Sequence, residues 1–125
     1  MSKVFISFAI EDKFARDNLV FQAKQNNTPF DFTDMSIKEP FDNSWKTRCR
    51  EIIRTCNGII VFVSDHTYYA DGARWEIKCG YDESIPVFPV YIHDEGAKKH
   101  PPELIGKRIY HWTWPNIKGF LESLK

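Results

Sequence analysis

Ile59-Ile60-Val61-Phe62-Val63 is an unbroken run of apolar, mostly β-branched side chains near the middle of the 125-residue sequence. A strand without polar alternation requires burial on both of its faces. Such burial is typical of a parallel sheet, because crossover helices cover both sides of it. This stretch therefore predicts an α/β fold with a central parallel strand at residues 59–63.

The sequence before this run alternates between strand and helix patterns. Short apolar or alternating runs predict strands, and apolar residues at a 3.6-residue period predict helices. Asn43 or Ser44 is expected to cap the second helix, and Pro40 with its polar neighbours predicts a loop before it. The expected elements are a central strand at Val4–Phe8, a helix over residues 11–25, an edge strand at Phe30–Phe32, a loop over residues 33–43 and a helix over residues 45–56.

The sequence after the run repeats this alternation. Pro86 and Pro89 place the next strand toward a sheet edge, because proline donates no hydrogen bond to a strand ladder. The expected elements are a helix over residues 70–82, a strand at Pro86–Tyr91, a polar loop over residues 93–102, a strand at Lys107–His111 and a last helix that Pro115 opens. We therefore expect one domain over residues 1–125, a flavodoxin-like three-layer α/β sandwich with a five-stranded parallel sheet of order 2-1-3-4-5.

Charge and composition exclude several functional classes. Seventeen basic residues balance seventeen acidic ones, so the sequence lacks the basic surplus typical of proteins that bind nucleic acid. No apolar stretch approaches the ~20 residues that span a bilayer, and the N-terminus shows no signal-peptide pattern. Cys49, Cys56 and Cys79 form no CxxC pair and are expected to be buried, reduced thiols. We therefore expect a soluble, cytoplasmic protein that contacts neither nucleic acid nor membrane.

Ligands of a doubly wound sheet bind beyond the carboxyl ends of the strands, where the winding reverses. Here Ser7-Phe8-Ala9 ends the first strand and Ser64-Asp65-His66 ends the third, while the loop over residues 33–43 and the segment 69–76 reach the same edge. The glycine-rich phosphate loops of nucleotide-binding folds are missing from the sequence. A phosphoacceptor receiver domain would need an acidic pair after the first strand, an aspartate after the third and a lysine after the fifth, and only the aspartate is matched, by Asp65. No sequence feature singles out a flavin.

One carboxylate at this edge suggests a chemistry. The segment Gly72–Glu76 places Glu76 in the first turns of a helix, where the helix dipole favours its anion at neutral pH. Glycosidases need two carboxylates because the leaving oxygen must be protonated. The nicotinamide of NAD is already cationic and departs neutral, so one carboxylate suffices to stabilise the ribosyl cation.

The candidate substrate contacts share a place at this edge of the sheet. Aromatic rings would stack on nicotinamide, and basic side chains would meet the pyrophosphate. Core packing explains Trp45 and Phe8 at least as well, Trp75 would brace its helix equally well, and Asp34 would equally cap a turn. A serine nucleophile is rejected because the nucleophile-elbow motif is missing. The candidates are Ser7, Phe8, Asp34, Lys38, Trp45, Arg48, Ser64, Arg74 and Trp75.

Several motifs resemble the TIR family. The TIR-like features are Val4–Phe8 followed by Glu11-Asp12, the strand ending Val61–Ser64, and the pair Trp75-Glu76. More narrowly, the chain resembles the TIR-like ThsB proteins of the Thoeris antiphage system. That resemblance rests on Phe30–Phe32 through Lys38-Glu39-Pro40-Phe41-Asp42, then Trp45-Lys46-x-x-Cys49-Arg50, and finally Gly72-x-Arg74-Trp75-Glu76.

This resemblance implies an enzyme that responds to phage infection and breaks the nicotinamide–ribose bond of NAD. Glu76 corresponds to the catalytic glutamate of TIR enzymes, NAD is a substrate and not a resident cofactor, and no metal is expected. The product would be a cyclic ADP-ribose isomer or another ADP-ribose conjugate that activates a separate effector. The loop over residues 33–43 corresponds to the BB loop, which in TIR domains mediates assembly and borders the active site.

Two other functions are compatible with the same fold. A non-catalytic TIR interaction module would act by self-association through the loop over residues 33–43. A receptor would bind a nucleotide without turning it over. The Trp75-Glu76 pair favours the enzyme, because a scaffold has no need of a carboxylate at the rim of the crevice.

Overall fold

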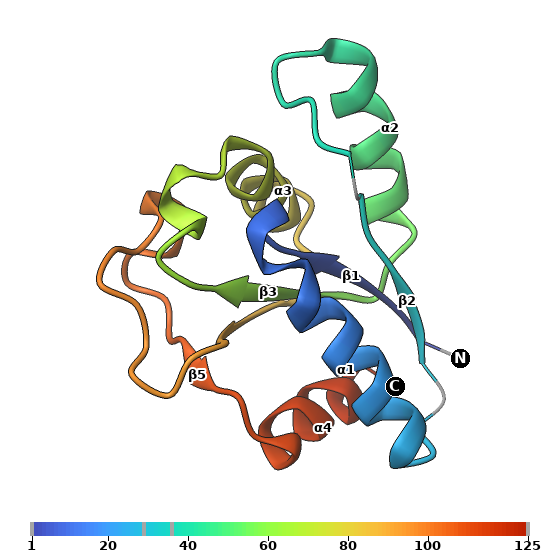
Figure 1. Cartoon of the computed structure of the whole chain (residues 1–125). Helices are drawn as coiled ribbons and strands as arrows, with labels where there is room; N and C mark the ends of the chain where they lie inside the picture. Colours follow the sequence, from blue (N-terminus) through green and yellow to red (C-terminus); the bar gives the residue numbers. More distant parts are fainter. Residues whose placement is uncertain (1, 29, 36, 125) are drawn as a thin grey trace.

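The computed structural model describes residues 2–28, 30–35 and 37–124 and contains a five-stranded parallel sheet (Figure 1). The strand order β2-β1-β3-β4-β5 is the predicted one, so β1 and β3 are neighbours and the winding reverses between them. The strands are β1 (Lys3–Ser7), β2 (Asp31–Thr33), β3 (Gly58–Val63), β4 (Val87–Tyr91) and β5 (Tyr110–His111).

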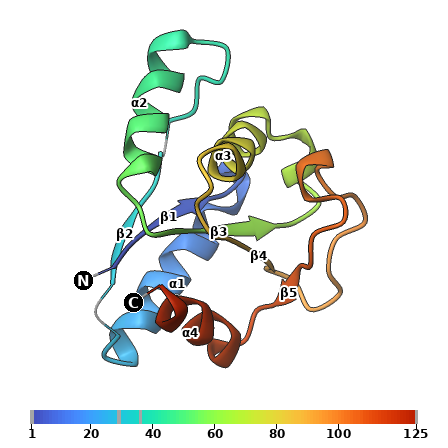
Figure 2. The same cartoon turned by 180° about the vertical axis from the view of Figure 1, so that it is seen from behind.

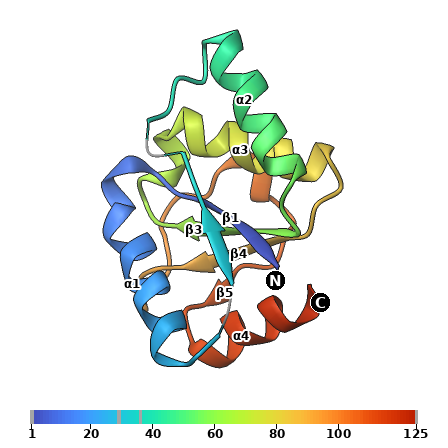
Figure 3. The same ribbon diagram turned by 90° about the vertical axis from the view of Figure 1, so that its right-hand side faces the viewer.

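Helices cover both faces of this sheet. Figures 1 and 3 show α2 and α3 on one side and α1 and α4 on the other, and the reverse view in Figure 2 shows the same layers. The fold is therefore the flavodoxin-like α/β sandwich expected of a TIR-like domain. None of the helices in the described ranges is both long and apolar enough to cross a lipid bilayer. The helices are α1 (Lys13–Gln25), α2 (Asn43–Arg54), α3 (Asp71–Asp82) and α4 (Trp114–Ser123).

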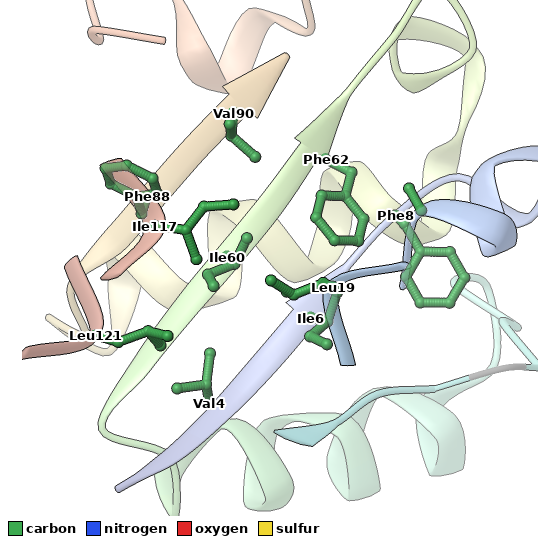
Figure 4. Packing of buried hydrophobic residues seen from close by; sticks show 11 residues of the cluster. Val4, Ile6, Phe8, Leu19, Ile60, Phe62, Phe88, Val90, Ile117 and Leu121 are labelled. Atoms are coloured by element: carbon green, nitrogen blue, oxygen red, sulfur yellow. The ribbon is translucent and has the colours of Figure 1, made fainter. Parts of the chain in front are cut away.

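The central strand β3 builds both halves of the core, as the apolar run predicts. Every residue of β3 is buried. Ile60 and Phe62 face α1 and α4 and pack with Ile6, Leu19 and other apolar side chains (Figure 4). Successive side chains of a strand point to opposite faces, so the remaining apolar residues of β3 pack toward α2 and α3. All three cysteines are free, buried thiols, as predicted. Cys56 was expected within the second helix but lies just after the end of α2.

The two prolines of the fourth strand do not place it at the sheet edge. β4 lies between β3 and β5 and pairs with both. The carbonyl of Pro86 accepts a hydrogen bond from Ile59, and the N–H of Ile92 donates to Val63 of β3. Backbone groups of a strand alternate in direction, so the Pro89 nitrogen points away from β3. β5 pairs only with Val90 and Tyr91, so β4 tolerates this missing N–H donor.

Several predicted boundaries shift by one or two residues, and two other differences have a clear structural reason. The fifth strand was expected over Lys107–His111 but comprises only Tyr110–His111. Gly106 adopts φ +78°, so the backbone turns just before the expected strand begins. The cap of α2 is Asp42, not Asn43 or Ser44, because a carboxylate oxygen of Asp42 accepts a hydrogen bond of 2.9 Å from the Trp45 N–H.

Two helical glycines provide a matched test of packing against the sheet. A Cβ at Gly80 of α3 would overlap the Ile59 side chain and lie 3.2 Å from Val87 Cγ2, whereas a Cβ at Gly119 of α4 meets no atom within 4 Å. We expect Gly80→Ala to lower the free energy of unfolding by about 1–3 kcal/mol. Gly119→Ala should raise it by about 0.5–1 kcal/mol, because alanine is the better helix former. Urea unfolding of both variants measures this difference, and equal effects would contradict it.

Candidate active site

Glu76 lies in the second turn of α3 and is fully buried. The last residue of β1, Ser7, donates its hydroxyl to Glu76 Oε1 at 2.8 Å and also lies 3.3 Å from the Ala73 carbonyl. Ser7 is itself fully buried. The end of a central strand therefore fixes the carboxylate at the carboxyl edge of the sheet, beside the crevice where the winding reverses.

Lys38 closes the site from the loop between β2 and α2. Its ammonium Nζ lies 2.8 Å from Oε1 and 2.8 Å from Oε2 of Glu76. The same Nζ lies 4.8 Å from the centroid of the Phe8 ring, close enough for a cation–π contact. Only 6% of the Lys38 side chain is exposed, so the ion pair is almost wholly shielded from water. Glu76 thus holds a cation against an aromatic ring in a dry site.

Gly72 permits this approach of Lys38. A Cβ at Gly72 would lie 2.7 Å from Lys38 Cβ and 2.8 Å from Lys38 Cδ. Real Cβ atoms essentially never come so close to other heavy atoms, so any larger residue would displace the lysine stem. The glycine of the Gly72–Glu76 segment therefore lets the Lys38 chain pass directly over the first turn of α3.

Contacts from two other helices hold the loop that carries Lys38. The indole Nε1 of Trp45 in α2 donates to the Ile37 carbonyl at 2.9 Å. The Arg16 guanidinium of α1 binds Asp34 at 2.7 Å. Trp45 is 1% exposed and so belongs to the core. Both contacts lie on the part of the loop before Lys38 and fix where its side chain begins.

Burial determines the protonation of Glu76. Desolvation raises the pKa of Glu76 from 4.5 to about 7, against the opposing effects of the Lys38 ammonium and the hydrogen bonds from Lys38 and Ser7. The helix dipole favours the anion at neutral pH, and burial opposes it. With a pKa near 7, Glu76 exchanges a proton in the physiological range.

The structure separates Ser64 from this site. Ser64 Oγ donates to Asp12 Oδ2 at 2.5 Å, and the other oxygen of Asp12 lies 3.1 Å from His66 Nδ1. Asp12 is 1% exposed, and its hydrogen bond raises the pKa of His66. Sequence analysis missed this cluster because Asp12 lies 52 residues before Ser64. The acidic Glu11-Asp12 pair was the available signal, and the cluster ties the end of β3 to the start of α1.

Arg74 and Trp75, which directly precede Glu76 in the sequence, contact other residues and not the Glu76 carboxylate. Arg74 donates to both carboxylate oxygens of Glu103, at 3.0 and 3.3 Å. Trp75 contacts Trp45 edge-on at 5.4 Å between ring centroids, and the Arg50 guanidinium lies 5.3 Å from its ring. Trp75 therefore braces α3 against α2, and Arg74 ties α3 to the segment after β4.

A separate cavity lies beside the Lys38 loop. Its volume is about 380 Å³, and its lining includes Asp34, Trp45 and the exposed Arg48. Ser7, Phe8 and Lys38 are thus the candidates that the structure brings to Glu76, while Asp34, Trp45 and Arg48 lie around the loop that covers it. Within the described part of the chain, no three His, Cys, Asp or Glu side chains gather as a metal site.

The raised pKa of Glu76 predicts how stability depends on pH. A buried carboxyl with a raised pKa binds its proton more tightly in the folded than in the unfolded chain, so its contribution to stability falls as pH rises from about 4.5 to about 7. Glu76→Gln removes this titration. Unfolding free energies measured at several pH values should show wild type losing stability relative to Glu76→Gln across this window. A relative gain would mean that Lys38 outweighs burial.

A comparison with protein families shows which family the chain belongs to. The family model described as Thoeris protein ThsB, TIR-like domain, matches residues 5–97, which run from β1 into the loop after β4 and include Ser7, Lys38 and Glu76. No curated protein matches the chain. The matched residues form most of the sheet and the whole site described above. The chain therefore belongs to the Thoeris ThsB TIR-like family.

Proposed function

We propose that this protein cleaves the nicotinamide–ribose bond of NAD, with Glu76 as the catalytic carboxylate. The observation that carries this proposal is the Lys38 ammonium held between the Glu76 carboxylate and the Phe8 ring. A site that already binds a cation in this way suits the cationic nicotinamide riboside. Membership of a TIR-like family from an antiphage system supports the same reading.

The bond changes need only one carboxylate. The C1′–N1 bond of NAD breaks, and its electron pair neutralises the nicotinamide ring, so no acid is needed for the leaving group. The positive charge moves to the ribose C1′ and ring oxygen, where Glu76 stabilises it. A hydroxyl, a base nitrogen or water then forms the new bond to C1′. When the attacking atom carries a proton, that proton is released, and the Glu76 carboxylate is placed to receive it.

Substrate reaches Glu76 only when the Lys38 loop opens. Glu76 is fully buried under Lys38, so the arrangement described here is a closed resting state. In the proposed cycle, a phage-derived trigger or assembly of several copies favours the open loop. Once NAD replaces Lys38, the dry pocket directs the ribosyl cation toward an acceptor other than water. The product is then a cyclic ADP-ribose isomer or conjugate that activates a separate effector in the cytoplasm.

A second candidate function draws on the same loop. Ile37 is 72% exposed and Phe41 is 84% exposed, and both flank the Lys38 segment. Exposed apolar side chains of this size are typical of interaction surfaces. A non-catalytic module would use them for self-association without turning over NAD.

A variant experiment distinguishes the two functions. Wild type, Glu76→Gln and the exposed control Glu51→Gln of α2 are incubated with NAD, in buffer and in lysate from phage-infected cells. Chromatography with mass detection follows NAD and its products. We expect wild type and Glu51→Gln to form nicotinamide and an ADP-ribose-derived product, and Glu76→Gln to lose at least about 100-fold of this rate. Equal survival of NAD in all samples would refute cleavage and favour the interaction module.

A further inference from the structure

Two segments far apart in the sequence form an aromatic and cationic cluster beside α3. The 3-10 helix Thr67–Tyr69 leads into α3, and the loop after β4 carries Lys99. Lys99 Nζ donates to the Tyr69 hydroxyl at 2.6 Å and lies 5.0 Å from the ring centroids of both Tyr68 and Tyr69. The two tyrosine rings meet edge-on at 5.0 Å. The cluster is therefore a preorganised arrangement of two rings and one ammonium.

The Tyr69 ring and the Lys99 ammonium of this cluster are accessible to a ligand. Tyr69 is 65% exposed, and Lys99 is exposed as well. An ammonium has three donors, and Lys99 gives one to Tyr69. Lys99 forms no ion pair with a carboxylate among the described residues, unlike Arg74, which Glu103 neutralises.

The cluster also lies close to the candidate active site. Tyr69 precedes Gly72 by three residues, so their Cα atoms are at most about 11 Å apart. Gly72 is the residue over which the Lys38 stem passes to reach Glu76. A dinucleotide whose nicotinamide end lies at Glu76 is long enough to place its other end at Tyr69.

We propose that Tyr69 and Lys99 form a subsite for an adenine nucleotide, with the purine stacked on the Tyr69 ring and a phosphate bound by the Lys99 ammonium. Base–aromatic stacking tolerates this exposed position, because a purine presents an apolar face to the ring while its edge remains in water. Lysine binds phosphate as a compact charge, and hydrogen bonding to Tyr69 raises the pKa of Lys99, which keeps it protonated. The assignment of this nucleotide as the adenylate half of NAD rests on the proposed function.

AMP tests the subsite without requiring the active site to open, because it lacks the nicotinamide riboside. Dissociation constants for AMP, adenosine and ribose 5-phosphate are measured by NMR titration up to millimolar concentrations. In wild type, AMP should bind about tenfold more tightly than either fragment, since it alone supplies both the purine and the phosphate. Equal binding of AMP and ribose 5-phosphate, or no binding of AMP, would overturn the subsite.

Variants assign the two contacts. Tyr69→Ala should reduce the affinity for AMP to that for ribose 5-phosphate, whereas Tyr69→Phe keeps the ring and most of the affinity. Lys99→Ala should reduce the affinity for AMP to the affinity for adenosine. Lys98→Ala is the matched control, because Lys98 contributes its backbone N–H to Asp65 and alanine retains that group. Affinities unchanged in Tyr69→Ala and Lys99→Ala would refute the proposal. If wild type binds AMP but does not consume NAD, the cleavage reaction is refuted and the subsite is not.

Discussion

The buried ion pair between Lys38 and Glu76 is the constraint on which the site depends. Taking a carboxylate and an ammonium out of water costs several kcal/mol per ion, and only close geometry with further hydrogen bonds offsets that cost. Here both carboxylate oxygens contact the ammonium, Ser7 adds a hydrogen bond, and the Phe8 ring contacts the cation. No buried side-chain nitrogen or oxygen in the described ranges lacks a hydrogen-bond partner. Opening of the loop, as the proposed function requires, would break these contacts with Lys38.

The fold brings the partners of this ion pair together from three places. The reversal of winding between β1 and β3 puts Ser7 beside the start of α3, and the loop after edge strand β2 passes over the same helix. Gly72 allows contact between the loop and the helix. Arg16 and Trp45 fix the part of the loop before Lys38 to α1 and α2. The position of Lys38 therefore follows from long-range packing and not from the loop sequence.

Local patterns in the sequence predicted most of the fold. The apolar run of β3 and the helical stripes gave the correct element order, because burial on a fixed period is a local property. The errors lie where one turn or one hydrogen bond sets the end of an element. Examples are the turn at Gly106, which shortens β5, and the Asp42 cap of α2. The sequence also indicated Glu76 as the carboxylate at the edge of the sheet.

Sequence reasoning placed Ser7, Phe8 and Lys38 at the same edge as Glu76 but did not predict the contacts among them. Arg74 was a candidate substrate contact because it lies two positions from Glu76, yet residues two apart on a helix point about 200° apart, and Arg74 binds Glu103 instead. The actual partner, Lys38, lies 38 residues before Glu76. Burial then changes the acid from a helix-stabilised anion to a group with a pKa of about 7. Both effects arise from tertiary contacts.

The same loop covers the carboxylate and presents exposed Ile37 and Phe41 to solvent. A partner or second copy that binds these side chains better in the open state would shift the equilibrium toward opening. Under the proposed function, cleavage and association would be linked through one segment, and the closed loop would protect NAD from continuous loss.

A crystal structure of Glu76→Gln with intact NAD tests the central claim most directly. The account predicts that the nicotinamide ring occupies the position of the Lys38 ammonium, between residue 76 and Phe8, and that Lys38 has left the site. NAD bound elsewhere, with Lys38 still in contact with residue 76, would contradict it.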